Sequence, residues 1–447
     1  MSIYITRLEK LREQLREKSI LILPAKSSLI RNRDTHYPYR ADSDILYLTG
    51  INEEEFSIVV SREKIVFYAR DRDPETERWT GRVTGHAVLK ERFASIAGLE
   101  VKLASTFYSN LESELLNHEV LLYNPGEDMV LDHKFFSILA KYRNLSRKKK
   151  SAPRELQMAS VLLSSMRRVK DSFEIEIMRQ AAKISTTAHN VLREFIQSTP
   201  QSISEFQLKA LIESEFMKAG ADRLAYPTIV AAGENATVLH YEGSYGVAKV
   251  GDFILVDAGC ELNGYASDIT RTTGLGSSLS VLKNDLYQLT LQAQLSATHA
   301  CRGGNTIDKI HELCVRELSR GLLELGLFNS VPKKFPKEQA AEKPAVLPLV
   351  KVSSLEEVIE HEYYSYYYMH RTSHYLGLDV HDVGDYYSRE KAIPLEAGVV
   401  ITIEPGLYFP SEYEFLSSEF KGIGIRIEDD ILITDGDPEN LTAAAVK

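Results

Sequence analysis

The chain of 447 residues is poor in cysteine and has no long apolar run. Its three cysteines, Cys260, Cys301 and Cys314, are too few and too scattered for a disulfide framework or a cysteine-rich zinc site. No stretch of roughly 18 apolar residues occurs, so no membrane-spanning segment is expected. Residues 1–19 lack the uninterrupted apolar core of a secretory signal. These absences predict a cytoplasmic protein.

The sequence also lacks an excess of positive charge. It contains 53 Lys and Arg against 63 Asp and Glu, which gives a formal net charge of −10. Nucleic acids and anionic membranes attract basic surfaces, so neither is expected to be the main partner. Charged residues make up 26% of the chain and aromatics 9%, a composition that indicates a folded globular enzyme and not a disordered chain.

Two domains are expected from the order of the patterns. Residues 1–165 alternate short apolar runs with helix-like polar segments, which predicts a mixed α/β domain. This region contains a basic, proline-bearing stretch at 146–155 that is typical of a solvated linker.

Residues 331–350, with four prolines and six charged residues, match no regular period and are expected to form a surface excursion or a mobile loop.

Helical periodicity opens the second region, residues 166–447. Asp171 and Glu174 form a plausible capping box before a long segment with one apolar face. A second helix is expected from Ser202, with Glu205 three residues on, to Gly220. Further helices are predicted at about 280–301 and 306–327, and strands at 252–257, 265–273, 399–404 and 423–434.

Two aspartates are brought together by a predicted hairpin. The dipeptide Asn263-Gly264 favours a two-residue turn between two strand-like runs. With that turn Leu262 pairs with Tyr265, and Asp257 and Asp268 become diagonal neighbours on one face. Two buried carboxylates repel each other unless one binds a proton or both bind a cation. A solvated or arginine-paired couple is the alternative interpretation of this motif.

Further ligand-type residues follow in the second half. His370, His374 and His381 lie within twelve residues, in a segment rich in Gly and Asp, which favours a functional cluster over three separate structural histidines. Glu404 ends an apolar strand just before a proline, and Glu428 lies within another. A carboxylate in such a strand is costly unless it is paired or metal-bound. A simple salt bridge is the alternative for Glu428.

These residues together form a set of hard ligands. Four carboxylates offset the charge of two divalent cations, and oxygen ligands with a single imidazole favour manganese, with cobalt or zinc as possible occupants. Two metals about 3.5–4 Å apart can share a bridging water and stabilise a tetrahedral intermediate. The chemistry implied is hydrolysis. The candidates are Asp257, Asp268, Glu404, Glu428 and one histidine.

The order of several sequence blocks resembles the pita-bread metallopeptidases, specifically the Xaa-Pro aminopeptidase (aminopeptidase P) branch. The resemblance implies an α+β protein in which an N-terminal aminopeptidase P-type domain, 1–165, precedes a catalytic pita-bread domain, 166–447. It also implies removal of the N-terminal residue from peptides with proline in second position. The blocks are RNRDTHYPYRADSDILYLTG, DAG…SDITRT, HRTSHYLGLDVHDVG, EPGLY and GIGIRIEDDILIT.

The resemblance implies a dinuclear metal centre. Asp268 and Glu428 would bridge both ions, Asp257 would complete one site, and His374 with Glu404 would complete the other. A metal-bridging hydroxide would attack the carbonyl before proline, with Glu404 as general base.

Other positions match further active-site residues of the family. His240 corresponds to the histidine that steadies the scissile carbonyl, His370 and His381 to histidines that contact substrate and shuttle protons, and Arg426 to an arginine that supports the ligands. Arg389 is a candidate substrate contact.

The first domain is implicated by the same resemblance. Asp34 and Trp79 fall where a neighbouring subunit helps to close the active site in this family, so substrate contacts by both residues and a homo-oligomer, a dimer or a tetramer, are expected. Ordinary core packing is the alternative for Trp79. Two departures from the family pattern are Arg371, where a glycine is usual, and the longer 331–350 segment.

Three rival functions remain. A prolidase, which cleaves only Xaa-Pro dipeptides, uses the same five ligands, and the block YPYRADSDILYLTG favours the aminopeptidase over it. A non-catalytic peptide-binding module on this fold would have lost ligands, and this chain retains all five. A creatine-type amidinohydrolase would not predict a complete dinuclear site.

Overall fold

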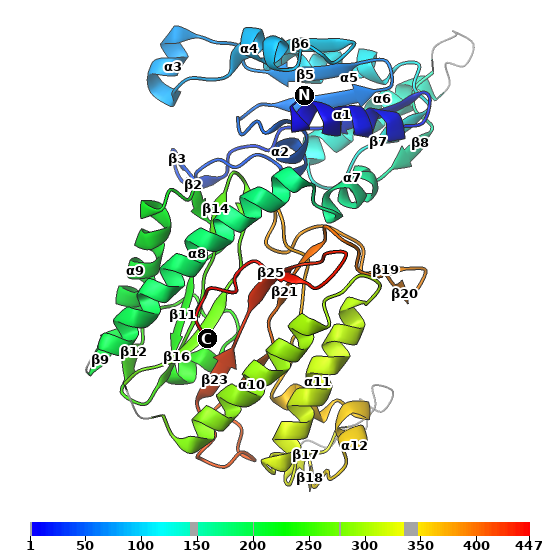
Figure 1. Cartoon of the computed structure of the whole chain (residues 1–447). Helices are drawn as coiled ribbons and strands as arrows, with labels where there is room; N and C mark the ends of the chain where they lie inside the picture. Colours follow the sequence, from blue (N-terminus) through cyan, green and yellow to red (C-terminus); the bar gives the residue numbers. More distant parts are fainter. Residues whose placement is uncertain (1, 144–150, 200, 277–278, 335–346) are drawn as a thin grey trace. The chain divides into compact units, whose positions relative to one another are not determined.

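The computed structural model describes residues 2–143, 151–199, 201–276, 279–334 and 347–447 (Figure 1). The chain divides into two compact units, Met1–Arg167 and Arg168–Lys447. Among the described residues, no helix combines the length and the apolar character needed to cross a membrane. The first half of the predicted linker, 146–150, lies outside the described residues, and its last residue, Glu155, begins a strand.

A six-stranded mixed sheet forms the centre of the first unit, in the order β6-β5-β4-β1-β7-β8. Its central strands are the predicted apolar runs, and α5 and α6 pack on one face of the sheet with buried Phe, Leu and Ile side chains. The mixed α/β prediction is confirmed. The elements are α1 (Ile3–Gln14), β1 (Ser19–Leu23), β2 (Ile30–Asn32), β3 (Thr35–His36), α2 (Ser43–Thr49), β4 (Ser57–Ser61), β5 (Ile65–Ala69), α3 (Pro74–Thr80), α4 (Gly85–Arg92), β6 (Leu99–Leu103), α5 (Phe107–Leu115), β7 (Val120–Leu122), α6 (Met129–Tyr142), β8 (Glu155–Gln157) and α7 (Ala159–Arg168).

The first unit contains a buried carboxylate, Glu114, whose side chain is 2% exposed. It accepts hydrogen bonds from Lys64 Nζ at 2.7 Å, Lys102 Nζ at 2.9 Å and the Tyr68 hydroxyl at 2.7 Å. Burial acts to raise the pKa of Glu114, but these donors hold it below its ordinary value. The carboxylate therefore joins two strands of the sheet to α5.

Replacing Glu114 with Ala is expected to lower the free energy of unfolding of the first unit by about 3 kcal/mol, because two lysines and a buried hydroxyl lose their acceptor. Urea-dependent hydrogen exchange of the β5 amides measures this locally. The control is Glu112→Ala, which removes a partly exposed ion pair with Lys141 and is expected to cost less than about 1 kcal/mol. Equal effects of the two variants would contradict the assignment.

The second unit begins with α8 (Ser172–Ser198), the long diagonal helix in Figure 1, with α9 (Glu205–Lys218) beside it. The predicted capping box is present at its start: the Asp171 side chain accepts from the Glu174 amide, and the Glu174 carboxylate accepts from the Asp171 amide. The predicted helices at 280–301 and 306–327 are also confirmed, as α10 (Val281–His299) and α11 (Ile307–Glu324).

The predicted start of the second helix is wrong by three residues. Ser202–Ser204 forms β9 and pairs with β12 (Val247–Lys249), so the helix begins only at Glu205. Its capping box is made by Ser204 and Gln207. The Glu205 carboxylate instead turns into the fold, where it accepts from the backbone N–H groups of Ala232 and Gly246. Pairing with a distant strand overrode the local helix signal.

Short sheets complete the second unit. The predicted excursion at 331–350 closes on itself, since β17 pairs with β18, and residues 335–346 lie outside the described residues. The ladders are β11-β13-β16, β10-β14-β15, β21-β24-β25, β22-β23, β9-β12, β17-β18 and β19-β20. Their remaining bounds are β10 (Arg223–Leu224), β11 (Ile229–Ala232), β13 (Phe253–Asp257), β14 (Cys260–Leu262), β15 (Tyr265–Ala266), β16 (Thr270–Gly274), β17 (Val331–Pro332), β18 (Leu349–Val350), α12 (Leu355–Glu360), β19 (Tyr387–Ser388), β20 (Lys391–Ala392), β21 (Val400–Ile403), β22 (Gly406–Phe409), β23 (Ile423–Arg426), β24 (Asp429–Leu432) and β25 (Glu439–Asn440).

Candidate metal centre

The predicted hairpin is present and holds two aspartates together. Leu262 pairs with Tyr265 and Asp257 with Thr270, so one register continues through β13–β16 and β14–β15. Asn263 and Gly264 have φ values of +49° and +85°, as a turn with two left-handed residues requires. Asp257 and Asp268 therefore share a face, as expected.

The Tyr226 hydroxyl lies between the two aspartates, 2.7 Å from Asp257 Oδ1 and 2.6 Å from Asp268 Oδ1. A phenol carries one hydrogen, so it cannot donate to both carboxylates at once. Burial and the adjacent carboxylates raise the pKa of Tyr226 well above its ordinary value, which keeps the hydroxyl protonated. Sequence reasoning missed Tyr226, because only the pairing of β11 with β13 brings this segment beside Asp257.

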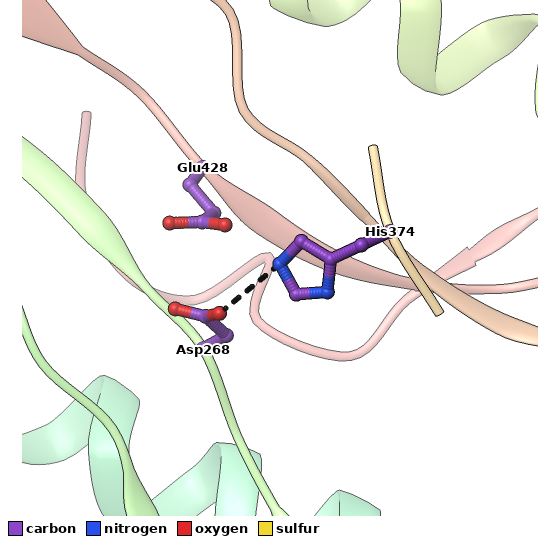
Figure 2. Close-up of side chains that lie close together, drawn as sticks. All are labelled: Asp268, His374 and Glu428. Atoms are coloured by element: carbon purple, nitrogen blue, oxygen red, sulfur yellow. Dashed lines mark ion pairs between the residues drawn. The ribbon is translucent and has the colours of Figure 1, made fainter. Parts of the chain in front are cut away.

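Three residues from distant segments complete the cluster. His374 Nε2 lies 3.5 Å from Asp268 Oδ2 and 3.6 Å from Glu404 Oε1. Figure 2 shows Asp268, His374 and Glu428 pointing toward one another, and their ligand atoms all lie within 4.8 Å. Glu404 follows β21 directly. All five predicted ligands thus converge on one region of the second unit.

A break between two strands turns Glu428 toward this cluster. The predicted strand at 423–434 is in fact two strands, β23 and β24, because the amide of Ile427 donates to Pro405 O and that of Glu428 donates to Thr270 O. The Glu428 carboxylate accepts from the Thr270 hydroxyl at 2.6 Å. Since this partner is neutral, the salt-bridge alternative for Glu428 does not hold.

Arg426 donates to one of the two hairpin aspartates. Its Nη2 donates to Asp257 Oδ2 at 2.6 Å, its Nη1 to the Tyr408 hydroxyl at 3.0 Å and its Nε to Thr270 Oγ1 at 3.2 Å. The arginine-paired alternative therefore holds for Asp257 in part. Its other carboxylate oxygen, Oδ1, remains directed at Tyr226.

The electrostatics of the cluster favour a bound cation. Burial, followed by the neighbouring carboxylates, raises the pKa of Glu428 well above its ordinary value, and burial raises the pKa of Glu404 to about 7. Burial also raises the pKa of Asp257. Burial opposes ionisation of Asp268 as well, but His374 beside it holds its pKa below the ordinary value. Divalent cations would remove this repulsion, and four carboxylates with one imidazole suit them.

Comparison with known proteins identifies the chain. The model of metallopeptidase family M24 matches residues 176–435, and the model of the aminopeptidase P N-terminal domain matches residues 4–120. The chain belongs to metallopeptidase family M24. It is therefore a hydrolase that depends on divalent metal ions.

Relatives of this M24 member match along its whole length. It is 33% identical to the Xaa-Pro aminopeptidase of Escherichia coli, over 99% of this chain and 94% of that protein. Among solved structures it resembles aminopeptidase PepP of Pseudomonas aeruginosa (TM-score 0.89, 34% identity, 99% and 95% of the two chains) and a zinc-substituted E. coli aminopeptidase P in complex with product (TM-score 0.88, 33% identity, 100% and 96%). The expected order along the chain, an aminopeptidase P-type N-terminal domain followed by a pita-bread fold, is confirmed.

Of the three predicted histidines that are not metal ligands, His370 and His381 lie against the ligand cluster of this M24 chain. His370 contacts the Tyr408 hydroxyl through Nε2 at 2.9 Å, and its Nδ1 lies 3.6 Å from Glu404 Oε2. The ring centroid of His381 lies 4.3 Å from that of His374. Burial lowers the pKa of His370 to about 3 and, with the charge of His374, lowers the pKa of His381. Both imidazoles are therefore neutral at pH 7.

The remaining predicted residues lie farther from the ligands or in the other unit. His240 is exposed and lies close enough to His370 and His381 to act on both electrostatically. Arg389 lies at the exposed turn between β19 and β20. Asp34 and Trp79 belong to the first unit, and Trp79 is 90% exposed, so the core-packing alternative is wrong.

Arg371, the residue that departs from the family pattern, does not extend toward the ligands. Its guanidinium forms an ion pair with Asp308 near the start of α11, and the Tyr387 hydroxyl donates to the same carboxylate oxygen at 2.8 Å. Neither departure from the pattern removes a predicted ligand.

A second buried network of hydrogen bonds and ion pairs, formed by Arg271, Asp429 and Lys447, contacts the main chain at Glu428. Arg271 donates to the carbonyl oxygens of Thr270 at 2.9 Å and Glu428 at 2.6 Å, and its Nη2 lies 2.6 Å from Asp429 Oδ1. Lys447 Nζ lies 2.6 Å from the other oxygen of Asp429. Burial opposes the ionisation of Asp429, but these two cations keep its pKa well below its usual range. Arg271, paired with Asp429, thus holds the main chain at Thr270 and at Glu428.

Proposed function

We propose that the chain is an Xaa-Pro aminopeptidase, which releases the N-terminal residue from peptides with proline in second position. The observation that carries the proposal is the convergence of four carboxylates and His374 in a chain that matches aminopeptidase P relatives over its whole length. A prolidase is the second candidate, because it would use the same ligands. The match to the aminopeptidase P N-terminal domain favours the first.

The metal site is proposed to be dinuclear, with Asp268 and Glu428 shared between two ions, Asp257 on one side and His374 with Glu404 on the other. Manganese is the proposed occupant, since oxygen ligands outnumber nitrogen, and the zinc-substituted relative supports zinc as a possible replacement. When bound, the ions would supply the positive charge that activates water and stabilises an oxyanion.

The residues around the ligands would handle protons and orient the substrate. Glu404 would accept a proton from the attacking water. His240, His370 and His381 would contact the scissile carbonyl and the leaving nitrogen. Arg426 would hold Asp257 in its ligating orientation through the 2.6 Å contact.

The first domain is proposed to take part in substrate binding. In this proposal residues 1–165 form the aminopeptidase P-type domain and 166–447 the catalytic domain. Asp34, Trp79 and Arg389 would contact the peptide, with Asp34 and Trp79 supplied by a neighbouring copy in a dimer or a tetramer. The 90% exposure of Trp79 supports a role in contacts outside its own unit.

A paired assay tests the function. An Xaa-Pro-Yaa tripeptide and the matching Xaa-Pro dipeptide are incubated with manganese-loaded protein, and a chelator-treated sample is the control. We expect faster cleavage of the tripeptide, lost on chelation. Cleavage of the dipeptide alone would make the chain a prolidase. No cleavage of either peptide, with metal confirmed bound, would favour the non-catalytic binding module.

A further inference from the structure

A buried ion pair lies behind the loop that carries His381. Lys170 Nζ lies 2.9 Å from Asp382 Oδ2, and both side chains are 1% exposed. Lys170 Nζ also donates to the carbonyl of Arg168 at 3.3 Å, and the Lys170 amide donates to Gly398 O at 2.8 Å. The free-energy cost of removing two charges from water can exceed the gain from their mutual attraction. A buried ion pair is therefore weak evidence that its role is to stabilise the fold.

Asp382 closes a short loop between two histidines. Its amide donates to the carbonyl of Tyr375 at 2.9 Å, and its Oδ1 accepts from the Asp379 amide at 3.4 Å. The loop therefore begins directly after His374 and ends directly after His381. Asp382 points into the fold and His381 is exposed, with its ring 4.3 Å from that of His374. The position of the Asp382 main chain thus sets that of the His381 imidazole.

Packing around the ion pair leaves the loop little freedom. A side chain at Gly377 would place its Cβ 2.2 Å from Asp382 Oδ2 and 2.9 Å from Lys170 Cε, so only glycine fits there. The carbonyl of Gly377 accepts from the Ala266 amide at 2.8 Å. Ala266 belongs to the hairpin that carries Asp268. The loop is therefore fixed on one side by Lys170 and on the other by the hairpin.

We propose that Lys170 and Asp382 are positioning residues for His381: the buried pair fixes the loop that holds this imidazole beside His374. The inference rests on the proposed function, since it assigns His381 to the proposed site. Lys170 itself would touch neither substrate nor metal.

A double-mutant cycle tests the coupling of Lys170 to His381. Lys170→Met, His381→Ala and the double variant are loaded with manganese, and kcat and KM are measured on an Xaa-Pro tripeptide. Lys170→Met is expected to lower kcat by about 10- to 100-fold, with KM changed less and metal content equal to wild type. It should change nothing further in the His381→Ala background. An equal fold-loss in both backgrounds, or loss of metal, would overturn the proposal.

Two further measurements keep the test decisive. If Lys170→Met does not fold, Lys170→Met/Asp382→Leu removes both charges together and leaves neither unpaired. The His381 imidazole resonance, assigned by its absence in His381→Ala, is expected to shift in the Lys170 variant and not in Lys309→Met, an exposed control on α11. An unchanged resonance would refute the positioning role, whether or not the wild-type protein cleaves either peptide. Failure of the wild-type protein to cleave both peptides would count against the proposed function only.

Discussion

Replacing Glu404 with Ala is expected to reduce kcat/KM for an Xaa-Pro tripeptide by about 10³-fold or more, because general-base catalysis alone contributes about 10²–10⁴-fold. The variant also loses one of the five proposed ligands, and Glu404 lies 3.6 Å from both His374 Nε2 and His370 Nδ1. Steady-state kinetics with saturating manganese measure the activity. Titration of bound manganese in the same samples separates the loss of metal from the loss of the base.

Two variants serve as controls for Glu404. Glu404→Gln keeps the size of the side chain and removes its charge, so it is expected to be nearly as inactive as the alanine variant. Glu414→Ala removes an exposed carboxylate from the same unit and should leave kcat/KM unchanged. Activity retained in both Glu404 variants would show that the ligand and base assignments are wrong.

Replacing Arg271 with Met is expected to lower the free energy of unfolding of the second unit by about 3–5 kcal/mol, the usual cost of removing one partner from a buried pair. Asp429 is fully buried and would lose its contact at 2.6 Å, while the carbonyls of Thr270 and Glu428 would each lose a charged donor. Urea unfolding monitored by circular dichroism, in chelator, measures the change without any contribution from bound metal.

The matched control is Arg316→Met, the same substitution at an exposed pair. Arg316 lies 3.9 Å from Glu356, with half of its side chain in solvent, so its loss is expected to cost less than about 1 kcal/mol. If Arg271→Met cost no more than this control, the buried network would have no structural role.

Local signals in the sequence were sufficient for the parts of the site that depend on neighbouring residues. The Asn263-Gly264 turn fixes the register that places Asp257 beside Asp268, and Asp171 with Glu174 begins α8 as predicted. Both depend on hydrogen bonds over a few residues, for which residue type is a direct guide.

What the sequence could not reveal depends on contacts between distant segments. Ser202 extends as a strand because β12 pairs with it. Glu428 faces the cluster because Thr270 O accepts from its amide and Pro405 O accepts from the amide of Ile427. Tyr226 carries no local signal of its position between the aspartates. Such contacts follow from the packing of whole elements, and no periodicity within one segment encodes them.

The single register of the β13–β16 hairpin has a consequence for the order of events during folding. Asp257 and Asp268 are 11 positions apart, whereas Arg426 and His374 are more than 100 positions further along the chain. The entropy of loop closure grows with loop length, and contacts between near residues form fastest. The two carboxylates are therefore expected to meet before Arg426 or His374 reaches them, so millimolar divalent metal in the refolding buffer should accelerate this step.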